Sequence, residues 1–538
     1  MKHWWLLLLI LLQPLMYFGG LNGSFVFDDQ FLIVDTMGQL TPWAIFSGGL
    51  WGDTLNQANF YRPLFSITIW LDQQLFGLNT LGYHIHSLIW HMLNIFLFAR
   101  FAPLIVSNSR ATVATWVFGL HPLMSELVYW IAARNDTMAI AFALMFLNVF
   151  WRKMVLFTPS TPVSWKTIGL LSLIFTAGML SKESILVLFV PVGVHAYKQK
   201  RFALPVVMLG IVSLLFVWRA WIGVSTPEMH PDNVELFFNN QWGFIVDGFG
   251  RVFFPWRLSP ATPLEWGSTI WWHVVLALVM LGIMVSAIRK YENREWILWF
   301  IISILLTVPA IVYTANYGDR YWAMGLIAWS LLYANVLPTV VSVLPLPIWA
   351  FIIVGRGFAW QSDLNFWQQE VEHHPTPYSY VSLAIIQYNE GDSEAAMNNF
   401  YEGFQATPPH LDGCVPFVSS VLSVQGGVSA LQSIDWAISR GCASSGEMMG
   451  LRAVILAGLG RWDDAKSIAE GDWIDRSQRL EVVRLALQAR TQDWDSFCPA
   501  VQLWSDRDRL LRQLTILSPK TFENTTELEE LCPKFLNE

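Results

Sequence analysis

Eleven apolar stretches, each close to the length that crosses the hydrocarbon layer of a membrane, constrain this 538-residue chain more than any other feature. A membrane-spanning helix needs about 20 predominantly apolar residues. Overall 54% of the residues are hydrophobic and only 14% are charged, which no soluble protein of this size matches. The sequence therefore predicts an all-α, polytopic membrane bundle of about 11 spans, near 4–20, 80–101, 111–130, 134–151, 166–180, 184–198, 202–222, 269–288, 295–314, 321–341 and 344–358.

Charge divides the chain into two parts. From Trp360 onward there are 25 acidic and 13 basic side chains, whereas the preceding part has 16 acidic and 20 basic ones. We therefore expect a membrane domain at 1–359 and a soluble domain at 360–538. The basic residues lie in short loops and not on one face, which argues against nucleic-acid binding. The apolar N-terminus could be a cleaved signal peptide, but no small-residue cleavage site follows, so an uncleaved first helix is the better interpretation.

Basic residues predict the orientation. Five clusters fall in alternate loops, which the positive-inside rule places in the cytoplasm. The loop after the first span, the segment 226–268 and the acidic tail are then extracytoplasmic. Short apolar stretches at 42–46 and 64–76 are expected to lie flat at the outer interface. The clusters are Lys2; Arg100 and Arg110; Arg152, Lys153 and Lys166; Lys198, Lys200 and Arg201; and Arg289, Lys290 and Arg294.

The tail has the pattern of helical repeats. Between Tyr380 and Pro408, large and small residues and a Gly391-Asp392 turn occur at tetratricopeptide offsets. A poorer copy occupies 460–465, and a third near Trp494 is barely detectable. One repeat cannot bury its own apolar face, so we expect the helices to stack as a degenerate solenoid.

All four cysteines lie in this tail. In an oxidising compartment, Cys414–Cys442 and Cys498–Cys532 could be disulfides, but three pairings are open, as are four buried thiols. Their spacing does not favour a metal site.

Two adjacent carboxylates, Asp28 and Asp29, directly follow the first span. The pair could be a solvated helix cap, with Asp29 opening the helix that contains Phe31. Alternatively one carboxylate deprotonates an acceptor hydroxyl while the other orients it, and two like charges so close raise one pKa, which suits a base.

Four basic residues come from four separate outer loops at the depth of the acidic pair. Arg62 could instead snorkel to headgroups, Arg134 could pair with Asp136, and Lys182 could pair with Glu183. A bundle does not need such cations to converge, but a departing lipid phosphate does. The predicted phosphate-binding set is Arg62, Arg134, Lys182 and Arg320.

Further polar residues mark the same region. Glu126 and Asp136 follow the turn that begins at His121, and His84, His91 and Asn94 share one helix face that we expect to face the bundle interior. No carboxylate joins the histidines at metal-ligand spacing, so no metal ligands are predicted, and a divalent-metal requirement stays open.

The motifs Phe-Asp-Asp, Tyr-Arg-Pro-Leu, Gly-Tyr-His, Leu-His-Pro, Ala-Arg-Asn-Asp, Leu-Ser-Lys-Glu and Asp-Arg-Tyr occur in this order, followed by a tetratricopeptide. The series resembles the transmembrane O-mannosyltransferases with tetratricopeptide repeats and their bacterial relatives, and more distantly other glycosyltransferases of the GT-C class. The resemblance implies a lipid-phosphate sugar donor, inverting transfer and a catalytic carboxylate at Asp28 or Asp29. The fading repeats indicate a bacterial protein, so together with the basic clusters we expect an inner-membrane protein with a periplasmic or otherwise extracytoplasmic tail.

The leading hypothesis is a membrane glycosyltransferase that moves a sugar from a polyprenyl-phosphate donor to a hydroxyl of a protein or glycan. Its site comprises Asp28 and Asp29, the four cations, and His84, Glu126 and Asp136. The alternative is a non-catalytic, membrane-anchored repeat scaffold for envelope assembly. A lipid flippase ranks last, because charges cluster at span ends and not at the bilayer midplane.

Overall fold

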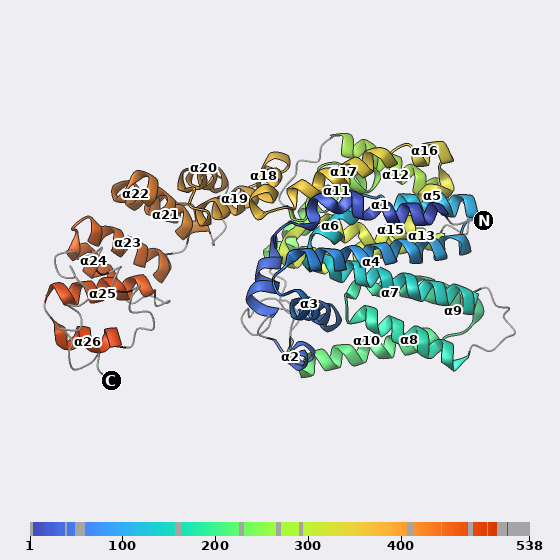
Figure 1. Cartoon of the computed structure of the whole chain (residues 1–538), viewed down its shortest axis with the longest axis horizontal. Coiled ribbons are helices and arrows are strands. Elements are labelled where there is room, and N and C mark those ends of the chain that lie inside the picture. The colour runs from blue at the N-terminus through green and yellow to red at the C-terminus, as the bar shows by residue number, and fades with distance from the viewer. Residues whose placement is uncertain are drawn as a thin grey trace. The chain divides into compact units, whose positions relative to one another are not determined.

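The structure, a computed structural model, is helical almost throughout (Figure 1). It describes residues 4–37, 40–48, 60–155, 164–224, 231–264, 271–289, 294–405, 413–442, 444–471, 477–491, 493–502, 510 and 514. The chain divides into two compact units, Met1–Gln369 and Glu370–Glu538. Each unit is described by itself.

The first unit is a bundle of long helices that run side by side (Figure 1). α1 (Trp4–Leu21) packs against α4 (Thr80–Phe101) and α17 (Leu346–Ala359), and α4 in turn packs against α7 (Arg134–Phe150). The layer continues from α7 to α8 (Trp165–Met179) and on to α10 (Ala203–Trp221). The other long helices are α11 (Pro231–Phe253), α12 (Trp271–Ile288), α13 (Arg294–Leu305) and α15 (Leu326–Val336).

Shorter elements connect these helices. They are η1 (Gln30–Thr36), α2 (Pro42–Ser47), α3 (Pro63–Phe76), η3 (Ala102–Leu104), α5 (Asn108–Gly119), α6 (Leu123–Tyr129), η4 (Ile131–Ala133), η5 (Trp151–Val155), η6 (Glu183–Leu188), α9 (Phe189–Gln199), α14 (Val308–Thr314), η8 (Asp319–Gly325), α16 (Thr339–Val343) and α18 (Asp363–His373). Two short strands, β1 (Thr262–Pro263) and β2 (Asn316–Tyr317), pair antiparallel with Thr262 opposite Tyr317. This pairing holds the loop before β1 against the start of η8.

The bundle confirms the predicted fold class, but its helices differ from the eleven expected spans. Among the described residues, six helical segments are long and apolar enough to cross a membrane: 4–21, 80–104, 131–155, 203–221, 294–314 and 339–359. The apolar helices at 165–179 and 272–288 are shorter. Three other expected spans are interrupted, because the helix at 111–130 breaks at His121-Pro122 and those at 184–198 and 321–341 begin as 3₁₀ turns. The predicted interfacial stretches 42–46 and 64–76 form α2 and α3.

The basic clusters gather at one end of the bundle. Arg152 donates a hydrogen bond to the carbonyl oxygen of Arg100, 2.8 Å away. One cavity is lined by both of these arginines and by Trp4, and a second cavity, which shares Leu104 with the first, is lined by Lys198 and Arg294. Described members of four clusters therefore meet near the start of α1, as their alternation along the chain predicted. Lys2 and Lys290 lie outside the described residues.

The second unit consists of consecutive helix pairs. The pairs are α19 (Pro377–Asn389) with α20 (Ser393–Phe404), α21 (Cys414–Gln425) with α22 (Gly427–Ser439), α23 (Gly446–Gly458) with α24 (Trp462–Ala469), and α25 (Gln478–Arg490) with α26 (Trp494–Gln502). Their first helices begin 32 to 37 residues apart, close to the tetratricopeptide period of 34. The sequence located the first, third and fourth pairs, whereas α21 and α22 lacked a recognisable signal. Pro408 lies outside the described residues.

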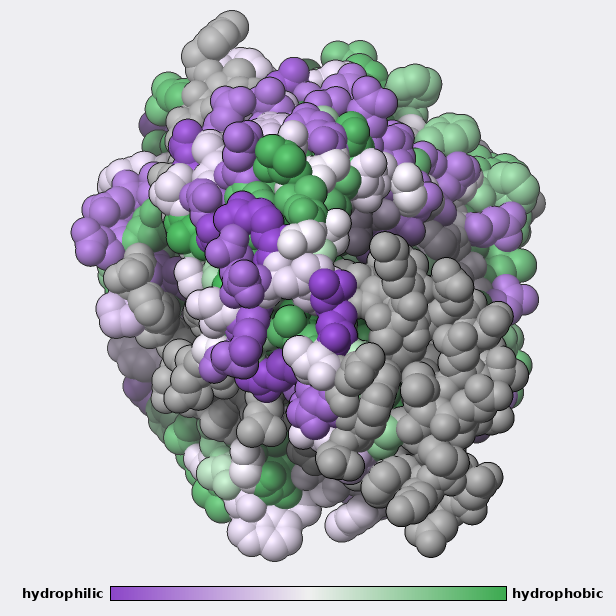
Figure 2. Space-filling view, turned by 90° about the vertical axis from the view of Figure 1, so that its left-hand side faces the viewer, coloured by the Kyte–Doolittle hydropathy of each residue, from purple (hydrophilic) through white to green (hydrophobic). Residues whose placement is uncertain are grey.

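Small and large residues build the core of this unit as the repeat pattern requires. Ala384, Ala396 and Phe400 are buried where α19 packs on α20. Gly391, at the turn between the two helices, has a φ of +89°, which favours glycine. On the face of the molecule shown in Figure 2, hydrophilic residues predominate over the centre and top, as expected of a solvated surface.

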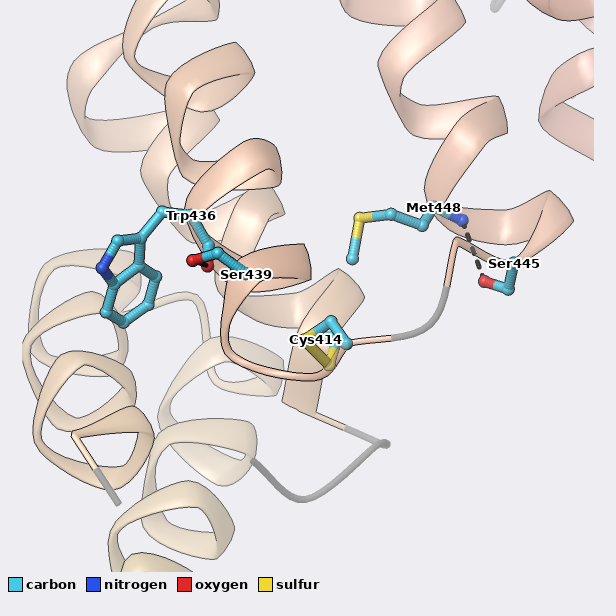
Figure 3. The surroundings of a disulfide bond; sticks show 6 residues. Cys414, Trp436, Ser439, Ser445 and Met448 are labelled. Atoms are coloured by element: carbon cyan, nitrogen blue, oxygen red, sulfur yellow. Dashed lines mark hydrogen bonds between the residues drawn. A yellow bond between two sulfur atoms is a disulfide. The ribbon is translucent and has the colours of Figure 1, made fainter. Parts of the chain in front are cut away.

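A disulfide joins Cys414 at the start of α21 to Cys442 just after α22 (Figure 3). Both sulfurs lie in the buried core, where Met448 of α23 points toward them. The first expected pairing is therefore present. The second pairing involves Cys532, which lies outside the described residues.

Candidate active site

The acidic pair is held in place by the residue before it. Phe27 has a φ of +61°, a left-handed conformation that costs a non-glycine residue about 1 kcal/mol or more. The centre of its ring lies 5.1 Å from the ring centre of Trp130 and 5.7 Å from that of Trp367. Its backbone N–H donates a hydrogen bond to the carboxylate of Asp363 at 2.8 Å. These contacts, all within the first unit, hold the turn and fix where Asp28 and Asp29 point.

Asp29 is fully buried, and its carboxylate accepts hydrogen bonds from a distant part of the chain. Its two oxygens accept the N–H groups of Ile131 at 3.1 Å and Ala132 at 2.7 Å, at the start of η4. Burial raises the pKa of Asp29 well above its usual range, against the opposing effect of these two hydrogen bonds. The alternative in which Asp29 caps its own helix is wrong, because its side chain makes no capping bond to η1.

Asp28 has a different environment. Its side chain is only partly buried, and Arg320 is the charged neighbour that stabilises its ionised form. Burial nevertheless raises the pKa of Asp28 from 3.8 to about 6. A carboxyl group with this pKa is ionised at neutral pH and still basic enough to accept a proton.

Arg320 connects several of the predicted residues. One of its guanidinium nitrogens donates to Glu126 at 3.0 Å and to the carbonyl oxygen of Pro260 at 2.7 Å. Its guanidinium also lies 4.5 Å from the ring centre of Trp130 and 4.6 Å from that of Tyr321. Glu126 is fully buried, so Arg320 supplies the charge that neutralises it.

Lys182 and Arg62 extend this group of cations. Lys182 pairs with Asp136 and lies 6.0 Å from the ring centre of Tyr321, while Arg62 donates to Glu183 at 3.0 Å. Burial lowers the pKa of Lys182 to about 8, against the opposing effect of Asp136, and repulsion from Arg62 and Arg320 adds to the shift. Lys182 lies between the other two cations, because Lys182 and Arg320 approach the same Tyr321 ring and Arg62 pairs with Glu183, the residue next to Lys182.

Arg134 does not join them. Its guanidinium is fully buried and donates to Ser87 at 3.0 Å, to the carbonyl oxygen of Tyr83 at 2.9 Å, and to Asp72 of α3. Protein groups surround this side chain, so we do not include Arg134 among the cations proposed below to bind the donor phosphate. The alternative pairing of Arg134 with Asp136 is wrong, since Arg134 pairs with Asp72 and Asp136 pairs with Lys182.

The structure predicts a stability cost for Arg134→Gln. The substitution leaves Asp72 as a buried carboxylate without its main counter-charge, which costs about 3–5 kcal/mol. We expect a clearly lower melting temperature of the detergent-solubilised protein, whereas the exposed Lys166→Gln should change it little. An unchanged melting temperature in Arg134→Gln would contradict the structural role.

The predicted interior residues are buried. His84 lies beside the backbone of Gly23 and Val128, and His91 contacts the ring of Tyr17. Asn94 donates to the carbonyl oxygen of Thr137 at 3.0 Å, which confirms that this helix face points into the bundle. No three histidine, cysteine or carboxylate side chains of the described part form a group that could hold a metal.

Sequence reasoning missed a second network of buried charges next to Arg320. Arg251 of α11 bonds Asp319 at 3.0 Å and Asp247 at 2.7 Å, and Asp247 also pairs with His273 at 2.6 Å. Arg356 approaches Asp319 at 3.8 Å. The sequence did contain a signal for this network. Asp247 and Arg251 are opposite charges four residues apart in the amphipathic helix α11, a spacing that places them on the same face. Because Asp319 immediately precedes Arg320, the network holds the backbone that carries this cation.

Comparison with known proteins identifies relatives of this chain. A protein O-mannosyl-transferase of Caenorhabditis elegans is 32% identical over 149 residues, which are 26% of this chain and 22% of that protein. Protein O-mannosyl-transferase TMTC3 of Homo sapiens is 27% identical over 173 residues, 31% of this chain and 19% of the relative. Protein O-mannosyl-transferase TMTC1 of Mus musculus is 33% identical over 144 residues, 25% of this chain and 15% of the relative.

The chain thus spans about a fifth of the length of the curated relatives that it matches. No family model matches the chain, and no solved structure does. The similarity to several members of one group agrees with the ordered motifs. Over about a quarter to a third of its length, this helical membrane protein with a repeat-bearing tail is therefore similar to protein O-mannosyl-transferases, in agreement with the resemblance of its motifs.

Proposed function

We propose that this chain is a membrane glycosyltransferase that transfers a sugar from a polyprenyl-phosphate donor to a hydroxyl group of a protein. The acceptor oxygen forms a bond to the anomeric carbon while its proton passes to the carboxylate of Asp28. The bond between the anomeric carbon and the phosphate oxygen breaks, and its electron pair leaves with the polyprenyl phosphate. Attack opposite the leaving group inverts the anomeric centre, as the family resemblance implies.

The observation that carries the proposal is the difference between the two aspartates. Asp28 is partly exposed, has a raised pKa and is stabilised by Arg320, so it has the access and basicity that a general base requires. Both oxygens of Asp29 are occupied by backbone N–H groups. Asp29 therefore acts as a positioning residue that fixes the loop of Asp28 to η4.

The three neighbouring cations suit a phosphate leaving group. Negative charge develops on the phosphate as the sugar departs, and fixed cations in a partly dry site stabilise it strongly. Arg320, Lys182 and Arg62 each already have one carboxylate partner, Glu126, Asp136 and Glu183 respectively. Those partners hold the cations in place before the donor arrives, so that little reorganisation accompanies binding.

The names of the relatives point to mannose and to a protein acceptor. The gathering of basic residues at the start of α1 supports a cytoplasmic position for that end and an extracytoplasmic position for the acidic pair. The disulfide between Cys414 and Cys442 supports the same side for the tail, because disulfides persist in oxidising compartments.

The function is tested by comparing cells with and without this chain. Intact glycopeptides from envelope proteins, analysed by mass spectrometry, should lose an O-linked hexose in cells that lack the chain and regain it when the full chain is restored. Identical glycopeptide profiles in the two strains would refute the proposal. The scaffold alternative predicts instead that a chain without its acidic pair restores the phenotype and that one without residues 370–538 does not.

The pH dependence of transfer follows from two opposing ionisations. The base Asp28 must be deprotonated, so kcat/KM should rise with pH through about 6, the pKa of its carboxyl group. The cation Lys182 must be protonated, so kcat/KM should fall as the pH passes about 8. We expect a bell-shaped profile, and Lys182→Arg should remove its alkaline limb because arginine keeps its charge. An alkaline limb that persists in Lys182→Arg would assign it to another group.

A further inference from the structure

A cavity of about 880 Å³ lies at the end of the bundle opposite the acidic pair. It is formed by the start of α1, the end of α4, the start of α5 and η5, which follows α7. Its lining residues include Trp4, Phe96, Arg100, Asn108 and Arg152. α1 has 18 residues, and at 1.5 Å per residue it separates the cavity from the loop of Asp28 by about 27 Å. The cavity is therefore distinct from the candidate active site.

The polar part of the cavity suits an anion. Arg152 donates to the carbonyl oxygen of Arg100 at 2.8 Å, so the two arginines are held together on one side. Asn108, Ser109 and Thr112, from the first turns of α5, add hydroxyl and amide groups. None of the described lining residues is acidic. Two guanidinium groups without a carboxylate among the lining residues attract a phosphate.

The rest of the cavity is apolar and continues onto a lipid-facing surface. Trp4, Trp5, Leu6 and Phe96 line it. Next to it, Leu7 and Leu11 are about 60% exposed on α1, in a helix that is long and apolar enough to cross a membrane. In a bilayer these side chains contact hydrocarbon, so the cavity opens where acyl chains meet headgroups. Tryptophan is the residue typical of that depth.

We propose that this cavity binds an anionic phospholipid of the leaflet at the basic end, with its phosphate on Arg100 and Arg152. Its acyl chains lie along Phe96 and the exposed leucines of α1. The continuity of the arginine pair with an exposed apolar surface favours a lipid over a soluble phosphate, which needs no such surface. Bound lipid here joins α1, α4, α5 and η5. It stabilises the folded bundle, because a ligand that binds only the folded state shifts the equilibrium toward that state.

The test uses the full-length protein in nanodiscs and in detergent. Native mass spectrometry should show retained phosphatidylglycerol in preference to phosphatidylcholine, and added phosphatidylglycerol should raise the melting temperature. The double variant Arg100→Gln with Arg152→Gln should bind phosphatidylglycerol about 30-fold more weakly, since each basic residue near the headgroups contributes roughly a factor of five. Lys166→Gln, which removes an exposed charge at the same end but outside the cavity, should bind as the unaltered protein does.

Two outcomes would overturn the proposal. One is unchanged retention of phosphatidylglycerol in the double variant. The other is an equal rise in melting temperature on adding inorganic phosphate alone, which would identify a site for a free anion. The melting temperature of the double variant in lipid-free detergent serves as the folding control, and it should equal that of the unaltered protein because both arginines are exposed.

Discussion

Asp28→Asn should reduce sugar transfer by a factor of about 10²–10⁴ while leaving the amount of folded protein unchanged. Asparagine has nearly the same shape as aspartate but cannot accept the acceptor's proton, and loss of a general base has an effect of this size. The side chain of Asp28 is partly exposed, so little packing depends on its charge. The measurement is the initial rate of transfer from a polyprenyl-phosphate sugar in membranes containing equal amounts of each variant.

Asp29→Asn provides the matched comparison. An amide group can accept only one of the two N–H bonds from Ile131 and Ala132, and its NH₂ group opposes the other donor. Leaving a buried N–H unsatisfied costs about 1–3 kcal/mol, so this variant should melt at a lower temperature. Its rate per folded molecule should fall less than that of Asp28→Asn. The reverse pattern, full transfer in Asp28→Asn and none in well-folded Asp29→Asn, would exchange the roles of the two aspartates.

The sequence could predict which residues approach one another because their motifs lie next to helix ends that alternate along the chain. Asp28, Arg62, Lys182 and Arg320 lie in loops that the alternation of basic clusters places at the same end. The end of the bundle at which a loop lies depends only on the number of times the chain has crossed the bundle before it. The prediction therefore survives breaks within a segment, such as those in the helices at 111–130 and 321–341.

The partners of the charged residues could not be predicted in the same way, because they come from different helices. Arg134 and Asp136 are two positions apart on α7, and side chains with this spacing point to different sides of a helix. This spacing disfavours the local ion pair, but it does not select Asp72 as the partner of Arg134 or Lys182 as the partner of Asp136. Which residues form these ion pairs depends on how α3, which contains Asp72, and the turn after α8, which contains Lys182, pack on α7.

The degenerate repeats show the same limit. α21 and α22 form a helix pair like its neighbours, yet their sequence lacks the Gly-Asp turn found at Gly391-Asp392. Gly426 makes the turn instead, with a φ of +83°. Burial of Phe417, Ile434 and the disulfide, and not a repeat signature, holds this pair in register.

Arg320→Gln should lower kcat by a factor of about 10²–10³, the effect of removing one preorganised group that stabilises charge in a transition state. Arg320 is the cation that stabilises the ionised form of Asp28, and its guanidinium lies 4.5 Å from the ring centre of Trp130. The substitution also leaves Glu126 buried without its counter-charge, so part of any loss could come from a disturbed fold. Kinetic constants for the lipid donor and melting temperatures are therefore measured together.

A double variant separates these two effects. Arg320→Gln combined with Glu126→Gln removes the uncompensated buried charge, so the melting temperature should return toward that of the unaltered protein. Transfer should stay low, because no cation replaces the guanidinium beside the departing phosphate. Arg320→Lys should recover part of kcat, since it keeps the charge but loses the planar, two-pronged geometry. If instead the double variant regains full transfer, Arg320 serves only to neutralise Glu126, and stabilisation of the leaving group falls to Lys182 and Arg62.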